Sequence, residues 1–231
     1  MTITEQTTVG EIAAAIPSSV RVFERHGVDF CCGGKRPLAT VCGERGLSLA
    51  QLTTEIEAAA ASAGAGESAG DWSAAPLDEL VDHIVRTYHE PLREELPRLE
   101  RMARKVRRVH GSKAAFLAHL DEVVGALSAD LTEHMRKEEL ILFPAIRRVS
   151  AGGRADRWIE GPITVMEQEH DAAGALLEEL RRLTSNYTAP DWACQTFRSL
   201  YHGLEELEAS MHVHVHLENN VLFPRAVAAA S

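Results

Sequence analysis

A histidine and a glutamate four residues apart occur twice in this chain, each time in the same local context. Residues 134–144 and residues 214–224 both read His-x-x-x-Glu, then four residues, then Phe-Pro. On a helix, side chains four residues apart lie on one face. A neutral imidazole and a carboxylate at that spacing can bind one metal ion together. The repeat therefore predicts a two-metal site with pseudo-twofold symmetry.

Histidines occupy the apolar stripes of the helices that the hydrophobic spacing predicts. His134 lies seven residues after Leu127 and seven residues before Ile141, a spacing that places its imidazole among core side chains. Histidines in comparable positions on the other expected helices are His89, His170 and His214. Each expected helix therefore directs at least one histidine toward the core.

Burying these imidazoles together with two carboxylates is unfavourable unless the groups are paired or bind metal ions. Two metal ions bridged by the two carboxylates would satisfy the whole set. Nitrogen and oxygen ligands without thiolates, with coordination positions left open, suit iron or manganese better than structural zinc. The alternative for any one of these histidines, taken alone, is a hydrogen-bonded core residue. The predicted ligands are His89, His134, Glu138, His170, His214 and Glu218.

Other polar residues near these positions have alternative roles. His212 and His216 form a second pair four residues apart, but on a face rotated away from His214, and the match between the two repeats favours His214 as the ligand. His83 lies off the face of His89 and is expected near the surface or behind a ligand. Asp130 and Glu169 are positioned either to orient a ligand or to be solvated acids.

The composition excludes several classes of protein. The chain has 231 residues, 45% of them hydrophobic and 25% charged, with a formal net charge of −10. An acidic chain without a basic patch is not typical of nucleic-acid or membrane-surface binding. No segment approaches the roughly 18 apolar residues of a membrane span, and the first 20 residues do not resemble a secretory signal. Four cysteines in this length do not form a disulfide framework, so we expect a reducing cytoplasm.

Helical periodicity dominates, so we expect an all-α protein with two domains. Residues 1–57 form a small helical domain with short helices over residues 9–16 and 18–26 and another beginning at Ser48. Residues 58–75 are rich in Ala, Ser and Gly and are expected to be a linker. Residues 76–231 form an up-and-down four-helix bundle in which each Phe-Pro pair marks a bend or a helix end. Its helices are expected over residues 76–109, 113–149, 159–186 and 190–228.

Two adjacent cysteines, Cys31 and Cys32, lie in a turn before a Gly-Gly pair. One hypothesis is a catalytic role as nucleophiles, with Lys35 and Arg36 lowering the thiol pKa. The alternative is two small side chains packed in a tight turn. A zinc site completed by Cys42 and His26 matches no standard spacing, and Cys194 is interpreted as ordinary helix packing.

These residues resemble the hemerythrin-like domains, and most closely the di-iron proteins for repair of iron centres, the iron–sulfur cluster repair family. The resemblance covers nearly the whole chain and implies the same six ligands, with no departure at any ligand position. It also implies two non-haem iron ions with oxo and carboxylate bridges. The matching segments are residues 29–35, 82–83, 88–89, 134–144, 161–163, 169–171 and 216–225.

The resemblance implies repair of iron–sulfur clusters damaged by nitric oxide or oxidants, through iron supply or nitric oxide handling. The expected partners are damaged iron–sulfur proteins and a diatomic ligand, with a homodimer left open. One rival is a reversible O2-binding module, which gives Cys31 and Cys32 no role. Another is an enzyme that reduces nitric oxide to nitrous oxide at the same centre, and a third is an iron sensor, for which no output module is present. Whether the protein is an enzyme stays open at this stage.

Overall fold

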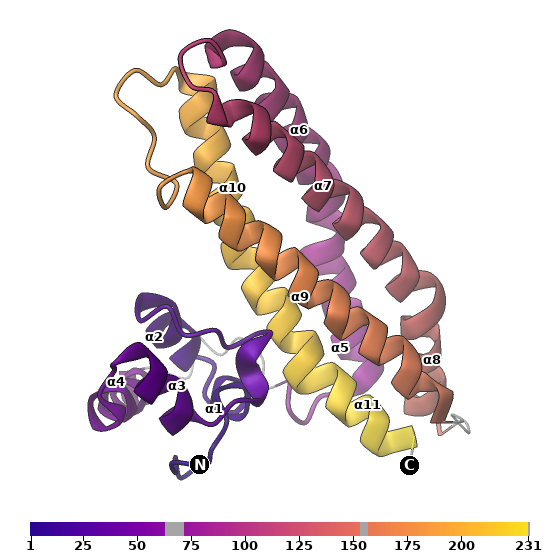
Figure 1. Cartoon of the computed structure of the whole chain (residues 1–231). Coiled ribbons are helices and arrows are strands. Elements are labelled where there is room, and N and C mark those ends of the chain that lie inside the picture. Colours follow the sequence, from indigo (N-terminus) through magenta and orange to yellow (C-terminus); the bar gives the residue numbers. More distant parts are fainter. Residues whose placement is uncertain (63–71, 153–156, 231) are drawn as a thin grey trace. The chain divides into compact units, whose positions relative to one another are not determined.

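The computed structural model describes residues 1–62, 72–152 and 157–230 (Figure 1). In these residues the regular structure is helical, apart from an isolated β-bridge between Thr8 and Pro37. The prediction of an all-α protein is confirmed. None of the described helices is both long and apolar enough to cross a membrane.

The chain divides into two compact units. The first, here called the N-terminal unit, comprises Met1–Val81, Ile146–Arg157 and His212–Ser231. The second, here called the bundle unit, comprises Asp82–Ala145 and Trp158–Met211.

Four long helices build the bundle unit (Figure 1). They are α6 (Glu90–His110), α7 (Phe116–Lys137), α9 (Glu160–Leu183) and the part of α10 (Gln195–Leu217) that ends at Met211. Helix α7 packs against both α6 and α9. Arg181 of α9 pairs with Glu208 of α10, and Gly203 of α10 lies against Leu99 of α6. These contacts close the four helices into a ring.

Apolar side chains repeating every three or four residues hold the bundle unit together. On α6 this series alternates steps of four and three residues, which keeps one stripe of the helix facing its neighbours. Burying each such side chain contributes about 1.5–3 kcal/mol. The stripe consists of Leu92, Leu96, Leu99, Ala103 and Val106, all buried.

Three π-helical turns interrupt the long helices: η2 (Val85–His89), η3 (Glu138–Leu142) and η5 (Glu218–Leu222). In each, the residue after the turn donates its N–H to the carbonyl five positions earlier. A proline follows two positions after the end of every one of these turns: Pro91, Pro144 and Pro224. Proline has no N–H and its ring clashes with the carbonyl four residues back, so a wider turn just before it relieves the clash.

Because of these turns, the helices continue beyond each Phe-Pro pair as α8 (Phe143–Ser150) and α11 (Phe223–Ala230). The first long helix likewise begins with α5 (Leu77–Ile84) and passes through η2 into α6. Of the two expected alternatives at Phe-Pro, a bend or a helix end, the helix end was therefore wrong, and the local feature is a π-helical turn within a continuing helix. A π-helical turn contains one residue more than an α-helical turn, so it also shifts which of the following side chains face the core. Ile141, expected in the core, is 53% exposed, and Leu142 is buried instead.

The connection between the third and fourth bundle helices is longer than expected. Helix α9, which follows the short 3-10 turn η4 (Arg157–Ile159), ends at Leu183. Ser185, Asn186 and Tyr187 have left-handed φ angles of 50°, 55° and 56°, which a continuing right-handed helix cannot contain. Helix α10 then starts only at Gln195.

Short helices form the first part of the N-terminal unit: α1 (Val9–Ala15), α2 (Ser19–Arg25), α3 (Leu38–Arg45) and α4 (Leu49–Ser62). The sequence did not predict α3. Helix α4 continues through the alanines expected to begin the linker, because alanine favours a helix; residues 63–71 of that linker lie outside the described residues. Gly27, with φ of 62°, ends the second helix as expected. The buried core includes Ile12, Phe23, Leu38, Leu52 and Ile56.

The cysteine turn, residues 29–35, is held by side chains from the C-terminal part of the same unit. The Asn220 amide donates to the carbonyls of Phe30 and Cys31, each at 3.2 Å. Helix α1 and the 3-10 turn η1 (Gly33–Lys35) pack against η5, which contains Asn220. A Cβ on Gly34 would lie 2.4 Å from Asn220 Oδ1, and one on Gly10 would lie 2.2 Å from it. Both glycines therefore make room for the asparagine.

The Gly34→Ala substitution is expected to lower the free energy of unfolding by about 1–3 kcal/mol, because moving Asn220 forfeits its two hydrogen bonds. Denaturant unfolding followed by circular dichroism measures the change. The matched control is Gly43→Ala, within α3, where nothing lies within 4 Å of the added Cβ. Alanine there is expected to stabilise the helix by about 0.5–1 kcal/mol. Equal effects of both substitutions would show that the asparagine does not need this space.

Candidate metal centre

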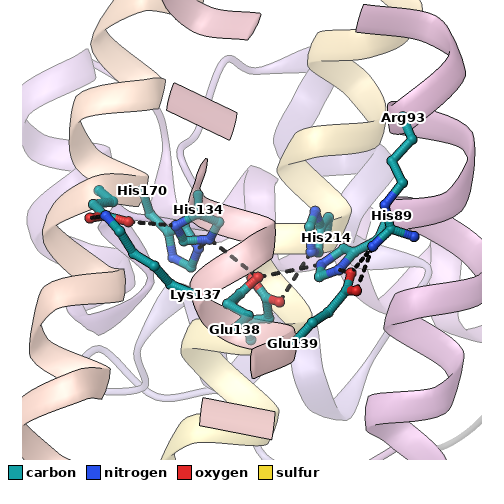
Figure 2. A network of polar contacts seen from close by, with 10 residues as sticks. His89, Arg93, His134, Lys137, Glu138, Glu139, His170 and His214 are labelled. Carbon is teal, nitrogen blue, oxygen red and sulfur yellow. Dashed lines mark hydrogen bonds and ion pairs between the residues drawn. The ribbon is translucent and has the colours of Figure 1, made fainter. Parts of the chain in front are cut away.

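Glu138 lies at the centre of the polar cluster in the bundle unit (Figure 2). Its Oε2 is 3.4 Å from Nε2 of His89 and 3.4 Å from Nε2 of His134. The side chains of Glu138 and His89 are fully buried, and that of His134 is nearly so. One carboxylate thus faces an imidazole from each of two helical segments, which is the arrangement that a bridging ligand requires.

A third imidazole approaches the same group. Nε2 of His170, on α9, lies 3.0 Å from Nε2 of His134. One possible ligand atom from each of His134, Glu138 and His170 lies within 4.8 Å of the others. His170 therefore converges with His134 and Glu138 inside the bundle unit, although 36 residues separate it from His134.

Two further carboxylates contact the Nδ1 atoms of His89 and His134, the ring nitrogens that do not face Glu138. Oε1 of Glu139 lies 2.7 Å from Nδ1 of His89, and Oε2 of Glu169 lies 3.0 Å from Nδ1 of His134. A carboxylate at Nδ1 keeps a proton on that nitrogen and leaves the Nε2 lone pair directed into the cluster. Each ring is therefore both oriented and fixed in one tautomer.

Each supporting carboxylate also contacts a cation on the helix that bears its histidine. Arg93 contacts Glu139 (Figure 2), and Lys137 contacts Glu169. Burial alone would raise the pKa of Glu139, but the hydrogen bonds from His89 and Arg93 outweigh it and lower that pKa. The same balance lowers the pKa of Glu169 below its usual value, with Lys137 and His134 as donors. Both carboxylates are therefore anionic at neutral pH.

The cluster fits a metal cation by the chemistry of its donors. With Nδ1 protonated, the Nε2 lone pairs of His89 and His134 point at the same carboxylate oxygen. Lone pairs facing one another in a buried space repel, and a cation among them turns that repulsion into coordination. Imidazole nitrogen and carboxylate oxygen, without a thiolate, suit iron.

The second copy of the repeat, in the N-terminal unit, has the same construction. Nε2 of His214 lies 3.1 Å from Oε1 of Glu218, and both side chains are buried. As in the first copy, the α-helix ends immediately before the glutamate, and the glutamate opens a π-helical turn. The repeated sequence therefore produces a repeated local structure, a buried histidine and carboxylate one turn apart.

The structure distinguishes the residues that the sequence left ambiguous. Glu169 contacts a predicted ligand, whereas Asp130 is exposed. His83 is half-buried and lies 3.1 Å from the Thr87 hydroxyl, in agreement with its expected place off the His89 face. Burial lowers the pKa of His216 to about 4, and its Nδ1 lies 3.3 Å from the carbonyl of Phe30. His212 packs edge-on against the ring of Phe30, so both histidines contact the cysteine turn.

The cysteine turn differs from the expectation of an activated thiolate. Oδ1 of Asp29 accepts from the N–H groups of Cys31 and Cys32 and from the Cys31 thiol, at 3.0–3.2 Å. The hydrogen bond with Cys32, burial and the charge of Asp29 raise the pKa of the Cys31 thiol. The prediction that Lys35 and Arg36 lower it was wrong, and Arg36 pairs instead with Glu44. Cys31 is therefore a thiol at neutral pH.

The remaining cysteines have separate environments. Cys42 is buried in the core of the small helices, and His26 contacts Glu55, so the unfavoured zinc site with the cysteine turn has no support. Cys194 was interpreted as helix packing, but it is exposed and lies 3.2 Å from Nε2 of His110.

Comparison with known proteins supports the interpretation of the cluster. Residues 50–226 match the hemerythrin HHE cation binding domain. The chain belongs to this family. Residues 5–60 match a domain of unknown function, DUF542, known as ScdA_N. The histidine and glutamate cluster fits the iron-binding site of a hemerythrin domain.

Some similar proteins match this hemerythrin-family chain over almost its whole length. One is the iron-sulfur cluster repair protein YtfE of Yersinia pseudotuberculosis serotype IB (strain PB1/+), 43% identical over 219 residues. Another is the protein of the same name from Yersinia pestis (strain Pestoides F), with the same identity and length. In both cases the match covers 95% of this chain and 96% of the relative.

Sequence reasoning missed Glu139 and the asparagines that follow Glu218. Glu139 adjoins a predicted ligand, and the π-helical turn that it shares with Glu138 was not foreseen. The proline two positions after each such turn is the sequence signal that could have located it. Asn219 and Asn220 could not be paired with the cysteine turn, because about 190 residues separate them along the chain.

The Glu139→Gln substitution is expected to lower the affinity for ferrous iron by about tenfold, because the predicted ligand His89 loses its anionic support. Competition with a chelator of known affinity measures the effect. The control is Glu133→Gln on α7, where the exposed carboxylate pairs with Arg136 at the surface. We expect no change in affinity there. An equal loss in both variants would contradict the assignment of Glu139 as a positioning residue.

Proposed function

We propose that this chain is a di-iron protein that repairs iron–sulfur clusters damaged by nitric oxide or oxidants. Membership of the hemerythrin HHE family and the names of its relatives support the proposal. The observation that carries it is the sharing of one buried carboxylate, Glu138, by the imidazoles of His89 and His134. A carboxylate shared in this way suits two adjacent metal ions better than one.

In the proposed centre, the two copies of the repeat act together. His89 and His214 would hold one iron ion, His134 and His170 would hold the other, and the two glutamates would be shared. This pairing follows from the repeat and from the burial of all six side chains. Ferrous iron held in such a set can bind nitric oxide at an open position or be passed to an acceptor. The proposed ligands are His89, His134, Glu138, His170, His214 and Glu218.

The surrounding residues of this chain position the centre. Glu139 and Glu169 fix the tautomer of two ligands, and the ring of Phe143 stacks on His89 at a centroid distance of 5.6 Å. The aromatic residue of the first Phe-Pro pair thereby restricts rotation of a ligand ring. These contacts would keep the imidazole nitrogens directed inward when iron leaves, so that the site can be refilled.

Cys31 and Cys32 remain proposed functional residues. Their sulfur atoms are 3.9 Å apart and both cysteines are free. Asn220, two residues after the proposed ligand Glu218, holds the carbonyl of Cys31. Because Cys31 is a protonated thiol, we assign the turn to contact with a client protein or with nitric oxide rather than to nucleophilic attack. Free adjacent thiols also suit the cytoplasm as the compartment.

The Glu138→Leu substitution is expected to abolish the magnetically coupled iron pair, because the shared carboxylate is removed. Metal analysis together with Mössbauer spectroscopy of the purified protein measures the coupling. The control, Glu133→Leu, is expected to retain two coupled ions. Two coupled irons in the Glu138 variant would show that this carboxylate does not bridge them.

The iron-loaded protein is expected to restore activity to a purified iron–sulfur enzyme that nitric oxide has damaged, whereas the metal-free protein is not. The number of iron ions that the protein loses for each client cluster restored measures iron donation. Steady formation of nitrous oxide with an electron donor would indicate turnover instead, and reversible coloured oxygenation would indicate an O2-binding module. Equal restoration by the metal-free protein would remove the role of the centre in repair.

A further inference from the structure

Cys194 lies outside the metal cluster and is the exposed member of the four cysteines. It immediately precedes α10, and its carbonyl accepts the N–H of Arg198 at 3.0 Å, so it stands at the N-terminal end of a 23-residue helix. Its sulfur lies 3.2 Å from Nε2 of His110. A nucleophile just before one helix and a base at the end of another are therefore in direct contact.

The imidazole in this pair is buried, although its partner Cys194 is an exposed residue. His110 is 9% exposed, and its ring forms a three-ring cluster with those of Trp192 and Phe197, with centroid distances of 5.5–5.7 Å. Contact with two neighbouring rings restricts rotation of the imidazole, so that Nε2 stays directed at Cys194. The aromatic rings thus orient the base, as a third group does in nucleophilic sites.

The end of α6 and the start of α10 favour a positive charge on the imidazole and a negative charge on the sulfur, respectively. His110 is the last residue of α6, where the negative end of the helix dipole favours an imidazolium. The sulfur lies at the start of α10, where backbone N–H groups favour an anion. Proton transfer from sulfur to nitrogen therefore places each charge at the helix end that stabilises it.

We propose that Cys194 and His110 form a reactive thiol site that exchanges with low-molecular-weight disulfides. Nε2 of His110 takes the thiol proton, and the sulfur of Cys194 attacks one sulfur of the disulfide. The sulfur–sulfur bond of the reagent breaks, and its leaving sulfur keeps the electron pair and receives the proton from His110. Cys194 is oxidised to a mixed disulfide, one thiol of the reagent is released, and a reducing thiol reverses the exchange.

This site is separate from the proposed metal centre. His110 lies 21 residues after His89 along a continuous helix, which corresponds to roughly 30 Å at about 1.5 Å per residue. Thiol exchange at Cys194 does not require iron, so its success or failure is independent of the repair function.

The test compares the native and the denatured full-length protein. Oxidised glutathione is added at neutral pH, the reaction is quenched with acid, and peptide mass spectrometry measures modification at each cysteine. We expect Cys194 to react about tenfold faster in the native protein than in concentrated guanidinium chloride, where the contact with His110 is lost. A thiol that is merely exposed reacts no faster in the folded chain, so a ratio of one or less would overturn the proposal. Buried Cys42 serves as the internal negative control.

A substitution distinguishes the effect of the His110 imidazole on the reaction rate of Cys194 from the effect of solvent exposure alone. His110→Gln is expected to reduce the native rate at Cys194 to that of the denatured chain, whereas His202→Gln, at an exposed histidine of α10, leaves it unchanged. Circular dichroism confirms that both variants are folded. An unchanged rate in a folded His110 variant would contradict the role of the imidazole. If that variant does not fold, the wild-type ratio of native to denatured rates decides.

Discussion

The burial of the Glu138 carboxylate is the constraint on which the rest of the bundle unit depends. A carboxylate without solvent is strongly destabilising unless cations or hydrogen-bond donors surround it. Two imidazoles approach it, two outer carboxylates hold those imidazoles, and Arg93 and Lys137 contact the outer carboxylates. Exposure rises along one branch from 0% at Glu138 through 26% at Glu139 to 47% at Arg93. A continuous series of polar contacts thus extends from the apolar core to a cation at the surface.

The π-helical turns let a continuous helix carry this arrangement. In a regular α-helix, the buried apolar positions would continue at an unchanged spacing through the predicted ligand positions. The wider π-helical turn shifts by one residue which side chains face the core there. The glutamate can then point inward, while the residues after it resume the apolar stripe at Leu142 and Leu222. Each turn is also followed by a proline, so its geometry is favoured by the local sequence.

The two copies of the repeat share their helical geometry but not their surroundings. Ile141 in the first copy is 53% exposed, whereas its counterpart Val221 is 4% exposed. The difference arises within the N-terminal unit, where α1 and η1 pack against η5 and Asn220 holds the cysteine turn. The first copy has Leu140 at the position of Asn220 and lacks the amide that could hold such a turn. A symmetric sequence repeat therefore supports an asymmetric protein.

The sequence by itself determined the helical class, the repeated His-x-x-x-Glu pairs and the inward placement of His89, His134 and His170. These properties depend on local periodicity, because a helix places residues four apart on one face whatever its neighbours are. Only the tertiary structure decided that Glu139 and Glu169 support two of these histidines, that Cys31 is a protonated thiol, and that Cys194 meets His110. These outcomes depend on contacts between residues far apart in the chain and on the burial that the contacts create. No local pattern of spacing contains that information.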